Sequence, residues 1–262
     1  MMFTTNPFAE LSASIAPIVM QIYVVIMIIL VAGGTLFDTI HKGSARYFFA
    51  NWRNAKNRGT HKVGGGAMVS LAIQTAAVDV ATSGEFCNAR RRVAHLLTMY
   101  GFVIYVVTTA IMVFGYPTPD VPTPAALPLL WYLGALMVCV GGYWFWFFIR
   151  VDVAAEGHSP LRLVRADLFV LSLLASTTMA LIWAILQPLG GLLTNVLLGL
   201  YLGATTVLFV SIPWSKFSHM FFKPAAAFQK RVAEANGSRG NLPAPADKPE
   251  VFGSARTLPR HY

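Results

Sequence analysis

Long apolar runs separated by polar connections dominate this sequence. A helix rises about 1.5 Å per residue, so an apolar run of about 20 residues crosses a hydrocarbon core about 30 Å thick. Five runs reach this length, at residues 17–37, 93–114, 127–149, 167–186 and 192–212. The pattern therefore predicts an all-α, polytopic membrane protein that is a bundle of five transmembrane helices.

The composition agrees with this class of protein. Of the 262 residues, 56% are hydrophobic and only 12% are charged, whereas a soluble domain carries about 25% charged residues. These values exclude a soluble monomer. The two cysteines, Cys87 and Cys139, lie far apart in the sequence, so they support neither a disulfide framework nor a thiolate metal site.

The 20 Lys and Arg residues are distributed unevenly over the connections. Nine lie in residues 38–92, three in 150–166 and eight after residue 212, whereas residues 1–16, 115–126 and 187–191 hold none. Because basic residues stay on the cytoplasmic side of a membrane, we expect an external N-terminus at residues 1–15 and a cytoplasmic C-terminus. The formal charge of +9 then reflects topology and a docking surface for an acidic partner, and nucleic acid is not its natural explanation.

Two further segments complete the expected organisation of the membrane domain, residues 16–232, and of the tail. Residues 63–82 are moderately apolar but contain three glycines, Gln74 and Asp79. A crossing there would move the basic run at residues 90–92 to the external side, so we expect an interfacial or re-entrant segment on the cytoplasmic face. Residues 233–262 are rich in Ala, Gly, Ser and Pro and predict a disordered cytoplasmic tail.

Ionisable residues are almost absent from the predicted spans, which argues against proton pumping and ion-coupled transport. Arg150, Arg165 and Asp167 lie at helix ends, where an orienting surface pair is favoured over a relay. The aromatic run at residues 143–148 is more typical of a belt at the membrane interface than of a wall that stacks on quinone. Pro213 predicts a kink or the end of the fifth helix.

Two histidines are candidates for a cofactor site. His95 lies in the first turn of the second predicted span and His219 follows the fifth, so we expect both imidazoles at a similar depth on the cytoplasmic side. Two histidines on facing helices at one depth are what the iron of a b-type haem requires as axial ligands. The neighbouring small residues Ala94, Gly101 and Ser218 would let a flat macrocycle approach the backbone.

The number of haems, and whether the two histidines bind haem at all, are further questions that these positions raise. A second haem would need histidines about one leaflet deeper, where the chain offers residues 105–109 and Tyr201. The sequence therefore admits at most one haem of this kind. The alternative is that His95 and His219 each cap a helix end or contact lipid phosphate.

Three stretches resemble the nitrate-reductase-gamma-like membrane subunits of cytochrome b type. Residues 84–95, Gly-Glu-Phe-Cys-Asn-Ala-Arg-Arg-Arg-Val-Ala-His, running into Tyr100-Gly101-Phe102, resemble the entry to their second helix. Residues 213–222 resemble the end of their fifth helix, and Asp167-Leu168-Phe169 resembles the start of their fourth. The resemblance covers residues 15–232. The C subunit of the quinone-interacting membrane-bound oxidoreductase usually carries a fused iron–sulfur domain, whereas this chain has two cysteines and looks more like the free-standing membrane anchors of dissimilatory adenylylsulfate reductase in sulfur metabolism.

The resemblance implies a role in electron transport at the bacterial cytoplasmic membrane. Relatives exchange electrons between a cytoplasmic iron–sulfur and flavin reductase, here adenylylsulfate reductase, and membrane quinone through b-type haem on the second and fifth helices. His95 and His219 match the cytoplasmic-side ligand pair, whereas Tyr201 stands near the expected fifth-helix ligand of the second haem. We expect the catalytic centre to lie on the partner, which would dock on residues that include Arg90, Arg91, Arg92 and Lys216. A cofactor-free docking anchor is the alternative.

Overall fold

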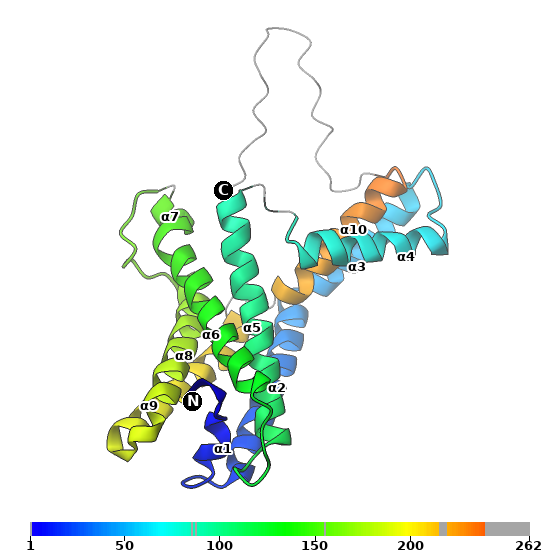
Figure 1. Ribbon diagram of the computed structural model, residues 1–262. Coiled ribbons are helices and arrows are strands. Elements are labelled where there is room, and N and C mark those ends of the chain that lie inside the picture. The colour runs from blue at the N-terminus through cyan, green and yellow to red at the C-terminus, as the bar shows by residue number, and fades with distance from the viewer. Residues whose placement is uncertain (1, 85, 87, 155, 215–218, 239–262) are drawn as a thin grey trace. The chain divides into compact units, whose positions relative to one another are not determined.

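Five long helices form the apolar part of the protein, as the sequence predicts. The computed structural model describes residues 2–84, 86, 88–154, 156–214 and 219–238, which form helices and connections without strands (Figure 1). The five helices long and apolar enough to cross a membrane are α2 (Pro17–His41), α5 (Ala89–Gly115), α6 (Ala126–Trp144) with the π-helical turn η3 (Phe145–Ile149), α8 (Leu168–Leu186) with the 3-10 turn η5 (Gln187–Leu189), and α9 (Gly191–Val210). The expected five-helix membrane class is therefore confirmed.

Two of these helices extend beyond their predicted ends for local reasons. α2 continues to His41 because Asp38, one turn before its end, pairs with Lys42. α5 begins at Ala89 because the Asn88 side chain accepts hydrogen bonds from the backbone N–H groups of Arg90 (3.0 Å) and Arg91 (3.3 Å), as an N-cap does. The basic run at residues 90–92, expected in a connection, therefore lies in the first helical turn.

The chain divides into two compact units, which are described separately. Unit 1 comprises Met1–Leu36 and Val93–Phe217, and unit 2 comprises Phe37–Arg92 and Ser218–Tyr262, each as far as it is described. α2 and α5 each run from one unit into the other. The sequence predicts one membrane domain and a tail, and it does not predict this division into two units.

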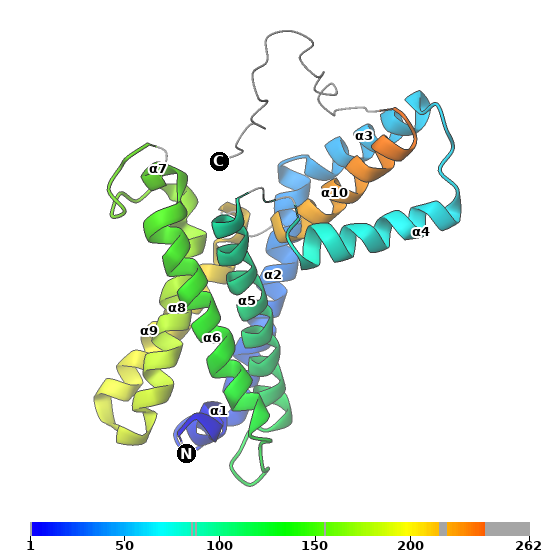
Figure 2. The same cartoon turned by 45° about the horizontal axis from the view of Figure 1, so that its top comes forward.

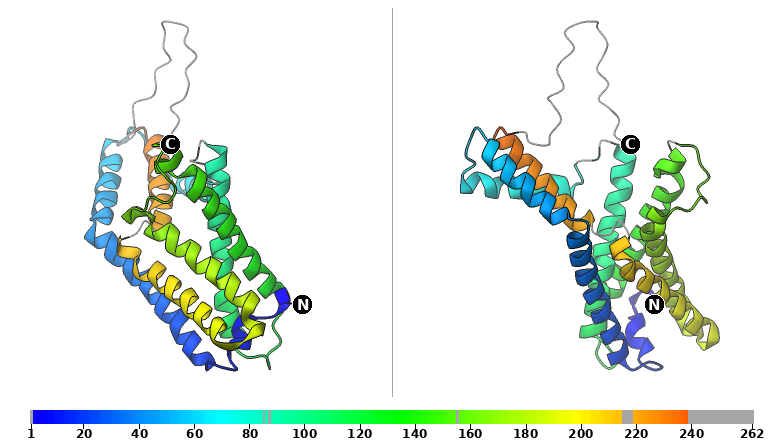
Figure 3. Two further views of the ribbon diagram at one scale, coloured as in Figure 1. Left: turned by 90° about the vertical axis from the view of Figure 1, so that its left-hand side faces the viewer. Right: turned by 180° about the vertical axis from the view of Figure 1, so that it is seen from behind.

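Small residues bring α5 and α6 of unit 1 into close contact. A Cβ atom added to Gly101 would lie 2.7 Å from the carbonyl oxygen of Gly134, and one added to Gly141 would lie 2.6 Å from that of Ala94. Lipid tails are as apolar as the helices, so helices in a membrane associate by close packing and favour small residues at the contact. α8 and α9 also run side by side, in yellow-green and yellow in Figure 3, and the hydroxyls of Ser176 and Thr205 link them at 2.7 Å.

The N-terminal residues fold back onto the bundle. A short helix, α1 (Pro7–Leu11), is capped by the Asn6 side chain, whose amide also donates to the carbonyl oxygen of Tyr116 (2.9 Å). The Phe8 ring packs on Trp131 and Trp183, with centroids 5.7 and 5.8 Å away. Gln187 donates to the carbonyl oxygen of Pro7 (2.8 Å). The three segments without Lys or Arg thus meet at one end of unit 1, as the predicted topology requires, while the side of the membrane stays a prediction.

The described part of unit 2 contains three helical segments besides the end of α2 and the start of α5. Its elements are α3 (Ser44–Arg58), α4 (Gly65–Gln74) continued by the π-helical segment η2 (Thr75–Ala81), and α10 (His219–Ala235). α10 contacts α3 on one side and α4 with η2 on the other (Figure 2). The segment expected at residues 63–82 is therefore largely helical and packed into a folded unit.

The boundary predicted for the tail is wrong by a few residues. α10 continues to Ala235, so the segment expected to be disordered from residue 233 begins inside a helix. The reason is a set of non-local hydrogen bonds at Asn236. Its carbonyl oxygen accepts from the N–H groups of Thr60 (2.9 Å) and His61 (3.1 Å), and its side chain donates to the carbonyl oxygen of Ala55 (3.1 Å). Residues 239–262 lie outside the described residues.

Candidate functional site

His95 lies near the start of the membrane-spanning part of α5, in unit 1, and is half-buried. Two of the small residues expected to let a macrocycle approach, Ala94 and Gly101, are used for packing instead. Ala94 is buried with its carbonyl oxygen against Gly141 of α6, and Gly101 is buried against Gly134. Both positions are used for packing between α5 and α6, because a larger side chain there would keep the two backbones apart.

The α5 face that carries His95 continues into an apolar cluster. Phe102 lies seven residues, about two turns, after His95 and so on nearly the same face. It packs against the buried side chains of Val138, Leu173 and Leu208, from α6, α8 and α9. His95 lies on this face about two turns earlier, a place that suits a haem ligand and equally suits a helix-end residue.

The second predicted ligand, His219, does not continue the fifth helix. α9 ends at Val210, a 3-10 turn follows at Ile212–Trp214, and His219 is the first residue of α10 in unit 2. The predicted break at Pro213 is therefore confirmed. The side chain of His219 lies outside the described residues, as do Lys216 and Ser218. The His95–His219 pair stays a prediction.

The position of a second haem is occupied by tyrosines. The hydroxyl of Tyr105 on α5 donates to that of Tyr201 on α9 at 2.9 Å, and both side chains are buried. Tyr105 packs on Trp131 with ring centroids 5.4 Å apart, and Tyr201 stacks on Trp183 at 5.8 Å. Two buried phenols that pair with each other and pack on indoles offer no imidazole to an iron, so these residues do not fit a second haem.

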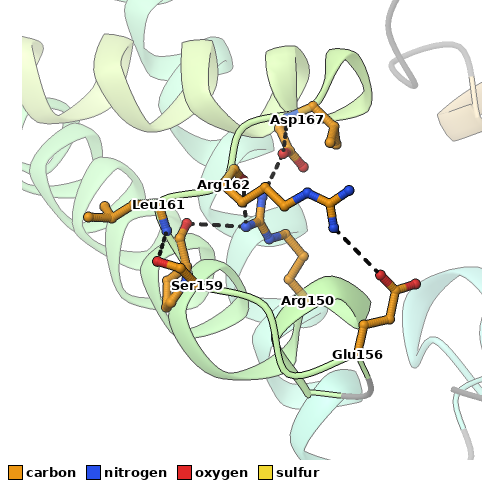
Figure 4. Close-up of polar contacts among 8 residues, drawn as sticks. Arg150, Glu156, Ser159, Leu161, Arg162 and Asp167 are labelled. Carbon is orange, nitrogen blue, oxygen red and sulfur yellow. Dashed lines mark hydrogen bonds and ion pairs between the residues drawn. The ribbon is translucent and has the colours of Figure 1, made fainter.

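The predicted surface pair of Arg150 and Asp167 is instead a buried clasp in unit 1. Arg150 Nη1 lies 2.5 Å from Asp167 Oδ2, and the two residues are only 4% and 7% exposed. Arg150 Nη2 donates to the carbonyl oxygens of Pro160 (3.1 Å) and Arg162 (2.9 Å) (Figure 4). The guanidinium also lies 4.0 Å from the centroid of the Trp146 ring. The pair closes the loop between α6 and α8. Its role is structural because Nη1 and Nη2 of the guanidinium both donate to oxygens of the protein.

Positive charge is concentrated in unit 2. Its described residues include twelve Lys and Arg but three Asp and Glu, and two of these carboxylates, Asp38 and Asp79, pair with Lys42 and Arg231. The exposed basic residues of α3 are Arg46, Arg53 and Lys56 on one side of the helix and Arg58 at its end, and we call this set the α3 basic face. No acidic residue lies in α3. This face is the best-developed candidate surface for an acidic partner.

The predicted docking residues at the start of α5 have different environments. Arg90 is exposed, whereas Arg91 and Arg92 are half-buried. Arg92 donates from Nε to the carbonyl oxygen of Thr82 at 2.6 Å and so ties α5 to the end of η2. Arg90 is thus the most accessible of the three, and Arg92 has a structural role that its place in a basic run does not indicate.

Sequence reasoning missed the ion pair between Asp79 and Arg231. Arg231 donates from Nε and Nη2 to the two Asp79 oxygens at 2.6 and 3.0 Å. The sequence does indicate that Asp79 has a partner, since it is the one carboxylate in an apolar stretch and such a group needs an opposite charge. What the sequence lacked was a reason to choose Arg231, 152 residues away.

Comparison with known proteins adds no relative of this chain. No family model, no curated protein and no solved structure matches it. The resemblance to the gamma-like membrane subunits therefore stays a prediction that depends on the residues quoted for it.

Proposed function

We propose that this protein is a multi-pass anchor of the bacterial cytoplasmic membrane that docks a cytoplasmic iron–sulfur and flavin reductase. By the sequence resemblance the partner is adenylylsulfate reductase, and the complex exchanges electrons with membrane quinone. The observation that carries the docking proposal is the α3 basic face on a folded helical unit between two transmembrane helices. The catalytic centre belongs to the partner.

The charge of unit 2 supports an acidic partner. With Asp38 and Asp79 already paired, few carboxylates remain in the described part of unit 2 to screen its cations. A surface of one sign attracts a partner of the opposite sign over about a Debye length, which raises the association rate and fixes the docking orientation. The α3 basic face is therefore suited to guide an acidic enzyme to the membrane.

The contacts of α3 support a preformed surface. The Trp52 ring stacks on Phe228 of α10 with centroids 5.9 Å apart, and Gln229 donates to the carbonyl oxygen of Phe48 at 3.1 Å. The Asn236 side chain holds the last turn of α3 through Ala55. Because these contacts fix α3 in place before a partner binds, α3 loses little conformational freedom on binding, and this favours affinity.

Electron transfer through haem is the further part of the proposal. His95 and His219 would supply the axial nitrogens, and the haem would supply one-electron transfer between the partner and quinone. His95 is half-buried on the α5 face that two turns later carries Phe102 of the apolar cluster, and this supports a ligand role. The alternative function, a cofactor-free anchor, needs only the docking surface.

Charge reversal on the α3 basic face tests the docking proposal. In native membranes, Arg53→Glu/Lys56→Glu should lower the amount of reductase that sediments with the membranes about tenfold at low salt, because attraction becomes repulsion. The control is Arg162→Glu/Arg165→Glu, which makes the same change in charge at two exposed arginines of unit 1. Equal losses from both variants, or no loss from the first, would contradict docking on α3.

A difference spectrum separates the haem relay from the cofactor-free anchor. The reduced-minus-oxidised spectrum of the purified full chain should contain a b-type alpha band that His95→Ala removes, while partner recruitment is retained. The matched control, Tyr105→Phe, changes a residue of the same helix that is paired with Tyr201 and should keep the band. A folded wild-type preparation without the band would rule out the haem and leave the anchor.

A further inference from the structure

The helix formed by α4 and η2 presents an apolar surface that no described part of the chain covers. Val69, Ile73 and Val78 are 60%, 63% and 45% exposed, and alanines fill much of the surface between them. We propose that this outward face is seated in the lipid interface of the bilayer, with unit 2 resting on it. The proposal is independent of the docking function.

The two faces of this helix differ sharply in chemistry. The inner face carries the less exposed side chains Met68, Leu71, Thr75 and Asp79, at helical spacing, and packs on α10. Between Lys62 and Arg90, Asp79 is the one charged residue that the structure describes. The outward face therefore carries no charge, as a lipid-contacting surface requires.

The ion pair with Arg231 removes the one obstacle to lipid contact. The Asp79 side chain is 12% exposed, and both of its oxygens accept from Arg231. An unpaired carboxylate at this place would hold the helix in water, because transfer of an uncompensated charge to an apolar phase is costly. The pair makes the helix locally neutral and at the same time fastens it to α10.

Length and connectivity favour the interface over the other possible environments. The apolar helix Gly65–Ala81 has 17 residues, about 25 Å, which is short of a hydrocarbon core of about 30 Å. The chain enters unit 2 from the span α2 and leaves it into the span α5, so the bilayer surface is the apolar phase within reach. Lys62, three residues before the helix begins, adds a cation that complements anionic headgroups.

The arrangement of unit 2 gives this contact a consequence. Because α10 contacts α3 and also α4 with η2, the apolar face and the α3 basic face belong to different helices of one small unit. Lipid on the α4 face would leave the basic residues of α3 available to an acidic protein. If a soluble partner or a second copy of the chain covered the α4 face instead, lipid contact and partner binding would not be assigned to separate helices of unit 2.

Site-specific photo-crosslinking identifies what covers the face. A benzophenone side chain is introduced at Ile73, and in a second protein at Val69, of the full chain in native membranes, and the adducts are analysed by mass. The matched control carries the same group at Lys56 on the α3 basic face. We expect lipid adducts at positions 73 and 69 and none at 56. Protein adducts at 73 and 69, or no adduct because the group faces water, would overturn the proposal.

A pair of substitutions tests the role of the ion pair. Arg231→Gln, which leaves Asp79 without its cation, should lower the lipid adduct at position 73 several-fold, and Asp79→Asn/Arg231→Gln should restore it. Exchange of the amides of α3 shows whether each variant keeps unit 2 folded. An unchanged yield in Arg231→Gln, or no recovery in the double variant when unit 2 is folded, would contradict neutralisation. Recruitment of the reductase is scored separately, so failure here and failure of docking are distinguishable.

Discussion

Unit 1 and unit 2 treat their polar groups in opposite ways. Unit 1 buries several polar groups in pairs with one another, as in the Tyr105–Tyr201 hydroxyl pair and the Arg150–Asp167 clasp. Its described residues include three arginines and no lysine. Unit 2 uses the half-buried Asp79–Arg231 ion pair and an aromatic stack to hold its helices and leaves most of its cations exposed. The first arrangement suits a hydrocarbon environment and the second suits water and an acidic partner.

This difference predicts which substitutions each unit tolerates. In a membrane, polar groups must be satisfied within the protein and helices associate by close packing, so unit 1 should respond to lost partners and to added volume. Unit 2 should respond weakly to changes on its exposed face and more to changes where α10 meets its neighbours. Three substitutions, in order of decreasing expected effect, test this contrast.

Removal of the carboxylate in the buried clasp should have the largest effect. Asp167→Ala leaves the Arg150 guanidinium, 4% exposed, without its anion, and breaking a buried pair in this way costs about 3–5 kcal/mol. The buried thiol of Cys139 provides the measurement, because in a Cys87→Ser background a thiol-reactive dye labels it when unit 1 unfolds. The unfolding midpoint should fall strongly.

The control for the clasp is Asp120→Ala, which removes an exposed carboxylate in the connection between α5 and α6. It should leave the midpoint nearly unchanged. Similar midpoints for Asp167→Ala and Asp120→Ala would show that the clasp is dispensable, and the contrast between the units would lose its strongest support.

Added volume in the α5–α6 contact should have an intermediate effect. Gly101→Ala places a Cβ 2.7 Å from a backbone carbonyl oxygen, and such overpacking costs about 1–3 kcal/mol. Gly199→Ala in α9 is the matched control, since a Cβ there has no atom within 4 Å and alanine favours the helix. Cys139 labelling should separate the two variants, and equal midpoints would mean that α5 and α6 are not in close contact.

Much of the membrane part follows from the sequence because its determinants are local. Length and hydropathy locate the five spans within a few residues, and Pro213 marks the end of the fifth, where a missing N–H interrupts the helical ladder. The short helix α1 also has a local signal, Asn6 followed by Pro7, which is typical of a helix start. Its burial against Trp131 and Trp183 has no such signal.

The parts that the sequence does not reveal depend on contacts between distant residues. α10 belongs with α3 and η2 because of pairs such as Trp52–Phe228 and Asp79–Arg231, and periodicity within one segment cannot choose such partners. The small residues beside His95 illustrate the same difficulty. Glycine and alanine permit the close approach either of a cofactor or of another helix. In the structure, Gly101 is the place where α6 approaches α5.

The smallest effect should come from the hydrogen bond at the end of α10. Asn236→Ala removes the side-chain bond to the carbonyl oxygen of Ala55 (3.1 Å) and the bond that the side chain accepts from the N–H of Ser238 (2.9 Å), while the backbone bonds to Thr60 and His61 can remain. One such bond contributes about 1 kcal/mol, so amide exchange of residues 55–61 should be about fivefold faster. Asn54→Ala, at an exposed position of α3, is the control. Faster exchange confined to this segment would identify the α3–α10 contact as local, whereas loss of protection throughout unit 2 would mean that Asn236 holds the whole unit together and that unit 2 is as sensitive as unit 1.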